Sequence, residues 1–174
     1  MTPSEFIEKA GNPKAWHAKA TALRRSADAV WEVFSHRLMN SIDSDTRSID
    51  DEKLDEAKDV LRNCQFLYSL AAECALKGLV IKQNPTEVTF DAIVDGTGSL
   101  VDAKIKRIGK NRIDTHNLES LAEIAGMVAK GGDAEIRELL SFSTFCINWI
   151  GRYPVPLEAS TDFLPRDKLP GVVF

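Results

Sequence analysis

The chain has 174 residues, enough for one hydrophobic core, and we expect a single domain spanning residues 1–174. Its 26 acidic residues outnumber 22 basic ones, which gives a formal charge of -4. This charge excludes a DNA- or RNA-binding protein that is basic along its whole length. A local basic patch is compatible with this balance. Hydrophobic residues are 44% and charged residues 28%, the proportions of a globular domain rather than of a disordered chain.

The first eight residues contain neither the basic stretch nor the apolar stretch of an export signal, so we expect a cytoplasmic protein. The most apolar segment, residues 67–79, is interrupted by Glu73 and Lys77, and we therefore expect no membrane span. The cysteines are odd in number and widely spaced among apolar neighbours, which predicts reduced core thiols rather than disulfides. They are Cys64, Cys74 and Cys146.

The first predicted helix runs from Pro13 to about Asn40, because apolar residues recur there at steps of three and four. Asn12 supplies an N-cap, and a proline suits the first helical position. The small polar residues of 40–50 predict a loop.

A second helix is predicted from Ser48 or Asp50 to the residue before Pro85, with acidic residues in its first turn. Beyond Cys64 it is apolar or small on nearly every side. That pattern is typical of a helix buried in the centre of a bundle.

Residues 84–115 are the least regular segment. Alternating residues on both sides of Asp95-Gly96 favour a β-hairpin, whereas Phe90 to Val94 would equally fit a short helix. Both structures are open for this insertion.

A third helix is predicted to start at His116, with Thr115 or Asn117 as its cap and Gly131-Gly132 as its end. The periodicity of Leu118 and the apolar residues after it places one face against the core.

A fourth helix is predicted from an Asp133 cap to about Ile150, with Gly151 as a left-handed C-terminal cap. The prolines that follow predict an extended tail over residues 157–174. The sequence therefore predicts an all-α fold: an up-and-down four-helix bundle with a loop or hairpin insertion between its second and third helices.

Glu73 and Lys77 are charged residues inside the most apolar segment of the chain. Their i, i+4 spacing, with the acid first, favours an ion pair along one helix face. Either the pair closes on itself at the edge of the core while the lysine stem snorkels, or Glu73 meets a partner from another helix, because a buried charge is costly unless it is paired.

A basic run precedes His116, and the two together make a candidate anion site in a net acidic chain. It contains no aromatic residue, which argues against a groove that stacks single-stranded bases. A solvated loop and a phosphate or RNA contact surface are both compatible with it. Its members are Lys104, Lys106, Arg107, Lys110 and Arg112.

Several chemistries have no motif in this sequence. The chain lacks Cys-x-x-Cys, His-x-x-x-His and any carboxylate–histidine cluster, so we expect no metal. Gly96-Thr-Gly98 lacks the remaining residues of a nucleotide-binding loop, and no Gly-x-Ser-x-Gly elbow is present. We expect no cofactor.

Three motifs in order resemble the HEPN superfamily, helical-bundle proteins of prokaryotic toxin–antitoxin and defence systems that also occur beside nucleotidyltransferases. They are Ala72-Glu73-Cys-Ala-Leu-Lys77-Gly-Leu, His116-Asn-Leu-Glu-Ser-Leu and Arg152-Tyr153-Pro154. The resemblance covers about residues 50–156. It implies a helical bundle and a composite polar site of Glu73, Lys77, His116 and Arg152.

Many HEPN proteins resemble metal-independent endoribonucleases that use an arginine followed after four to six residues by a histidine. This sequence departs from that pattern, because three residues separate Arg112 from His116 and eight separate Arg107 from it. We therefore predict a binding or partner module, acting as a homodimer through an exposed helix face, with a nucleotidyltransferase, an antitoxin, an RNA or a nucleotide as its partner.

The competing hypothesis is an endoribonuclease with a rearranged site. His116 would act as acid or base, Arg152 would stabilise the charge on the phosphorane, and Glu73 would orient one of them. A structural domain without a ligand is a third alternative. The arrangement of His116 and Arg152, in an open cleft or in buried ion pairs, separates these hypotheses.

Overall fold

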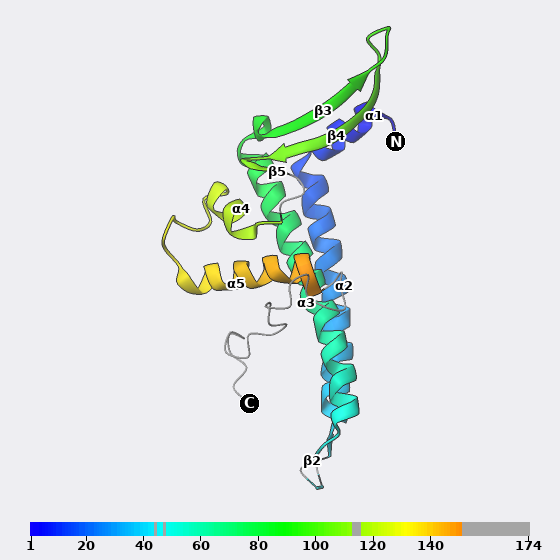
Figure 1. The fold of residues 1–174 in the computed structure, drawn as a ribbon, viewed down its shortest axis with the longest axis vertical. Coiled ribbons are helices and arrows are strands. Elements are labelled where there is room, and N and C mark those ends of the chain that lie inside the picture. The colour runs from blue at the N-terminus through cyan, green and yellow to red at the C-terminus, as the bar shows by residue number, and fades with distance from the viewer. Residues whose placement is uncertain (44, 47, 113–115, 151–174) are drawn as a thin grey trace.

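A computed structural model describes residues 1–43, 45–46, 48–112 and 116–150, and Arg152 and the tail lie outside these ranges (Figure 1). The helices are α1 (Pro3–Ala10), α2 (Pro13–Asn40), α3 (Asp51–Gln83), α4 (Leu118–Ile124) and α5 (Ala134–Phe145), with a 3₁₀ turn η1 (Pro85–Glu87) and a π-helical turn η2 (Cys146–Ile150). The strands are β1 (Ile42–Asp43), β2 (Ser48–Ile49), β3 (Val88–Val94), β4 (Leu100–Ile108) and β5 (Asn111–Arg112).

The prediction of an all-α, up-and-down four-helix bundle is wrong. The described chain mixes helices with two antiparallel sheets, β1-β2 and β3-β4-β5, and α5 lies across the long α2–α3 pair instead of alongside it (Figure 1). Helical periodicity identifies an apolar face but does not identify the element that covers it. Here the β-sheet lies over one end of the pair, where a bundle would carry more helix.

The α2–α3 hairpin is the longest element of the fold, and its ends were predicted correctly. The Asn12 side chain accepts from the Lys14 amide at 3.0 Å, and Asp50 accepts from the Lys53 amide at 3.2 Å. The helices approach closely at Gly78, which faces Trp16 and Pro13 of α2. A Cβ on Gly78 would lie 3.0 Å from the Cβ of Trp16, so this position admits no larger side chain without movement of α2.

The insertion is a β-hairpin, as one of the two predictions stated, and the alternative helix over Phe90–Val94 is wrong. Phe90 pairs with Ile105 in the register, and the Phe90 ring packs edge-on against Phe6 of α1 at 6.4 Å between centroids. Helix α1 was not predicted. Its signal is the capping box in which Thr2 and Glu5 bond each other's backbone amides.

The hydrophobic core lies where the C-terminal half of α3 meets α4, the end of β4 and η2. Asn117 caps α4 as predicted, but α4 ends at Ile124 rather than at the two glycines. Asp133 precedes α5 in a left-handed conformation with φ 52° and makes no capping hydrogen bond through its side chain. The fully buried core side chains include Ile81, Ile108, Leu118, Leu121 and Ile147.

Arg137 connects α4 to α5. Its guanidinium contacts the carboxylates of Glu119 and Glu123, the latter at 2.6 Å, and donates to the carbonyls of Ala129 and Gly132. Both carboxylates raise the pKa of Arg137, with the Glu123 hydrogen bond as the larger cause. One planar side chain thus joins two helices and the loop between them.

Helix α3 includes a stretch that is long and apolar enough to cross a membrane, contrary to the expectation from the sequence. In the fold, 44% of that stretch is buried. The three thiols are free, and Cys64 and Cys146 are buried as predicted while Cys74 is half-buried. Burial raises the pKa of all three, to about 12 for Cys146.

Tyr68 provides a pH-dependent link between the long helices. Its hydroxyl donates to Asp28 Oδ1 at 2.7 Å, and this bond raises the pKa of Tyr68 from 10.0 to about 12. A raised pKa means that folding favours the neutral phenol, so the contribution is complete below pH 10 and is lost between pH 10 and 12. We expect the free energy of unfolding to fall over this range in the wild type more than in Tyr68→Phe or Asp28→Asn, measured by urea unfolding. Equal falls in all three would contradict the link.

Candidate functional site

The polar cluster of this protein consists of Glu73, Lys77 and His116. Lys77 Nζ lies 2.7 Å from Glu73 Oε1, and His116 Nδ1 lies 2.9 Å from the same oxygen. The side chains of Glu73, Lys77 and His116 are 5%, 7% and 18% exposed. Both sequence hypotheses for Glu73 hold in part, since the pair closes within α3 and the carboxylate also meets a residue outside that helix.

Local structure places each member of the polar cluster. Glu73 and Lys77 lie one turn apart on α3, and His116 directly precedes Asn117, the N-cap of α4. The Leu118 side chain is buried and its amide donates to Thr144 Oγ1 at 3.1 Å, which fixes the start of α4 against α5. His116 is therefore held beside α3 by the burial of the residues that follow it.

Trp16 of α2 is the neighbour of the polar cluster that sequence reasoning missed. Lys77 Nζ lies 5.7 Å from the centre of the Trp16 ring, within the range of a cation–π contact. The Trp16 indole N–H donates to the Ala10 carbonyl at 2.8 Å, which orients the ring. The sequence contains a large aromatic residue in α2 and a glycine, Gly78, in α3, but only the pairing of the two helices shows that these residues meet.

In the polar cluster, the charged side chains of Glu73 and Lys77 contact each other and are almost fully buried. The Glu73 carboxylate already contacts a lysine of its own helix and a histidine from the segment before α4, and the second of these contacts joins α3 to that segment. General acid–base chemistry at His116 would fall to its Nε2 atom, because its Nδ1 lies 2.9 Å from Glu73 Oε1. The structure therefore brings together three of the four predicted site residues. The fourth, Arg152, lies outside the described residues.

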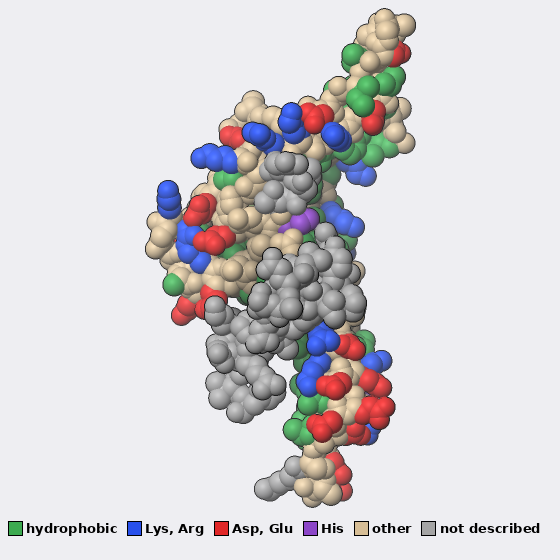
Figure 2. Space-filling model, viewed as in Figure 1, with side chains coloured by type: hydrophobic (Ala, Val, Ile, Leu, Met, Phe, Trp, Pro, Cys, Tyr) green, Lys and Arg blue, Asp and Glu red, His purple; other side chains and the backbone are tan. Residues whose placement is uncertain are grey.

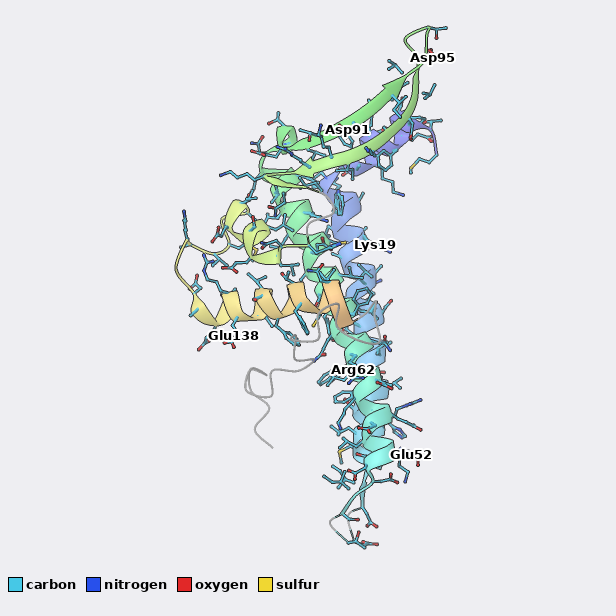
Figure 3. The ribbon with its side chains drawn as sticks, viewed as in Figure 1. Lys19, Glu52, Arg62, Asp91, Asp95 and Glu138 are labelled. Atoms are coloured by element: carbon cyan, nitrogen blue, oxygen red, sulfur yellow. The ribbon has the colours of Figure 1, made fainter. Side chains whose placement is uncertain are left out.

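Four of the five residues of the basic run lie on strands β4 and β5, and Lys110 lies in the turn between them. Lys106 lies 3.0 Å and Lys104 3.9 Å from carboxylate oxygens of Asp91 on β3, labelled in Figure 3. Arg107 is exposed and pairs in register with Arg112, whose side chain is not described. Basic side chains over the base of the sheet alternate with acidic ones (Figure 2). The exposed Lys110 completes the run.

Three cavities have linings made of described residues, and none of them includes the polar cluster. One, of about 490 Å³, lies between α2 and α3 beside Lys14, His17 and Lys82. Another, of about 290 Å³, lies between α1 and Trp16. The third, of about 470 Å³, lies on the half of the α2–α3 pair that is remote from the sheet, and we call it the distal groove. Its walls are Val30, Val33, Val60, Asn63, Phe66 and Leu67.

Comparison with known proteins adds no identification to this geometry. No protein-family model, no curated protein and no solved structure matches the chain. Within the described part of the chain, no three His, Cys, Asp or Glu side chains lie together as a metal site would require.

Proposed function

We propose that the chain is a HEPN-like module that binds a partner protein and does not cleave RNA. The observation that carries this proposal is the closure of the polar cluster, in which Lys77 and His116 both occupy one oxygen of the buried Glu73 carboxylate. Two motifs of the HEPN resemblance, those that contain Glu73 and His116, meet here at the junction of α3 with α4, and they act as a structural tie. Function then depends on surfaces that the described residues leave uncovered.

The binding surface is the distal groove. Two helices alone cannot cover each other's apolar residues, and among the described elements only the small β1-β2 sheet lies beyond this part of the pair (Figure 1). Val33 in the groove is 47% exposed, while Phe66 and Leu67 are half-buried. A groove lined by valine, phenylalanine and leucine side chains accepts the apolar face of a helix.

The charge around the groove selects the partner. Residues 43–59 contain eight acids, and Glu52 lies on the acidic lower part of α3 (Figures 2 and 3). Of the basic residues there, Lys53 is bound by Asp50 and Lys58 by Asp55. The partner is therefore an amphipathic helix with Lys and Arg along its polar edges. An antitoxin or nucleotidyltransferase with such a segment fits the HEPN resemblance.

A model peptide tests the groove directly. We expect a helical Leu/Lys peptide to bind the full chain, with affinity that falls as salt rises, and a Leu/Glu peptide of the same spacing to bind at least about tenfold more weakly. Val33→Arg should weaken Leu/Lys binding by about tenfold or more. Fluorescence anisotropy measures both.

Met39→Arg is the matched control, because Met39 is 67% exposed on the same helix and does not line the groove. It introduces the same charge and should leave binding within about threefold of the wild type. Equal binding of the two peptides, or equal loss in Val33→Arg and Met39→Arg, would contradict the proposal.

A further inference from the structure

The β3-β4 hairpin projects beyond the helices (Figure 1), and apolar residues on its strands beside the turn are exposed. Ile93 is 58% exposed, Val94 59% and Val101 51%. α1 packs against only part of the hairpin, where Phe6 meets Phe90. A two-stranded hairpin is marginally stable by itself, so this arm lacks the third strand or the cover that apolar sheets require.

The two edges of the arm are unequal. β4 is followed in the sheet by β5 at one end and is contacted by α1, whereas no described strand pairs with the outer edge of β3. β4 also carries Lys104, Lys106 and Arg107, and charges of this kind block association along an edge. β3 carries one charge, Asp91, which Lys106 neutralises at 3.0 Å. The open edge is thus the one without protecting lysines.

The sequence of β3 is complementary to a second copy of itself. In an antiparallel pair, residues directly opposite share a face of the sheet. Centring the pair on Ala92 places Ala92 opposite its own copy and Phe90 opposite Val94, which continues the apolar face from one protomer into the other. Among centres on the exposed half of β3, a centre at Asp91 would place that residue opposite itself, and a centre at Ile93 would place Asp91 opposite Asp95. A centre at Val94 would pair the strand with the turn that follows it, so Ala92 is the centre that pairs β3 with itself without facing acids.

We infer that two copies of this chain associate through β3, forming a four-stranded antiparallel sheet in the order β4-β3-β3-β4 about a two-fold axis at Ala92. The contact is isologous, so it closes after two copies and does not extend into a fibre. The sequence analysis expected a dimer through a helix face, and the open edge places it on the sheet instead. The dimer would hold two α2–α3 hairpins, and thus two distal grooves, on one particle.

Sedimentation equilibrium of the full chain between about 10 and 200 µM tests this dimer. A small interface of one strand pair predicts reversible association with a Kd of tens of micromolar, on the order of that for other small transient contacts. Ala92→Lys places two lysines face to face and should weaken association at least about 30-fold. Val101→Lys adds the same charge to the same arm on β4 and should retain the dimer, and circular dichroism verifies that both variants fold.

A cross-link tests the register. Cα atoms opposite each other in an antiparallel pair lie about 4.5–5.5 Å apart, within disulfide range. Ala92→Cys should therefore give a disulfide-linked dimer under mild oxidation, and Val101→Cys and the wild type should not. A wild type that is monomeric at 200 µM, an unweakened Ala92→Lys dimer, or a dimer without the Ala92→Cys cross-link would each overturn the inference. The grooves are tested separately by peptide binding, so failure of one proposal leaves the other measurable.

Discussion

A Lys77→Met variant is expected to lose about 3 kcal/mol of its free energy of unfolding, because removal of one partner from a buried ion pair strands the other charge. Glu73 is 5% exposed in its side chain and would keep only His116 at its Oε1 oxygen. The variant also loses the cation–π contact between Lys77 and Trp16. Urea unfolding followed by circular dichroism measures the change.

Two further variants show whether the loss comes from the stranded charge. Lys58→Met removes a lysine whose side chain is 47% exposed and should change the free energy of unfolding by about 0.5 kcal/mol or less. Glu73→Met with Lys77→Met replaces both charges by apolar groups and should recover most of the loss. A single variant as stable as the wild type, or a double variant less stable than the single one, would show that this pair is not the tie we describe.

A Gly78→Leu variant is expected to lose about 3 kcal/mol, because no space exists for its side chain. A Cβ at this position would lie 3.0 Å from the Trp16 Cβ and 3.3 Å from the Pro13 carbonyl oxygen, so α2 must move away from α3. That movement also displaces the Trp16 ring from Lys77. Thermal and urea unfolding measure the loss.

Gly78→Ala gives a graded comparison at the same position. Its single methyl group causes less overlap, and alanine gains up to about 1 kcal/mol over glycine in helix propensity, which offsets part of the strain. It should therefore be much closer to the wild type than Gly78→Leu. If Gly78→Leu were as stable as the wild type, the close approach of α2 and α3 at this point would be wrong.

The helix ends near Asn12, Asp50 and Asn117 could be predicted because a capping side chain acts within a few residues of itself. The hairpin around Asp95-Gly96 was one of two predictions for the same reason, since turn chemistry is local. The prediction of a four-helix bundle was wrong because the architecture depends on which element covers each apolar helix face. The periodicity of the sequence identifies such a face but does not identify the element that covers it. Helix α1 was not predicted because it has only eight residues, too few for a clear periodic pattern, although a capping box marks its start.

The candidate site was predicted in its residue types and in part of its geometry. The i, i+4 spacing gave the contact between Glu73 and Lys77 directly. That His116 would reach Glu73 across 43 positions came from the family resemblance, not from spacing. The contacts of Arg137 were not predicted, because its four partners lie on α4 and in the loop between α4 and α5, and their meeting with Arg137 depends on the tertiary fold.

The contrast between the polar cluster and the basic run has one physical origin. In both, lysines are paired with carboxylates in the fold, Lys77 with Glu73 and Lys106 with Asp91. The spacing along one helix predicted the first pair, whereas the second depends on the register in which β3 pairs with β4, which the sequence does not show. Burial then separates the two cases, because the first pair is sealed in the core while Lys106 is 54% exposed in its side chain.

Incubation of the purified full chain with total RNA and with transfer RNA, beside a His116→Ala variant, tests the central claim that the polar cluster is a structural tie and not a catalytic centre. We expect both proteins to leave the RNA intact, at the level of a buffer control, under conditions where an added ribonuclease degrades it. Cleavage by the wild type that is lost in a folded His116→Ala variant would contradict the claim.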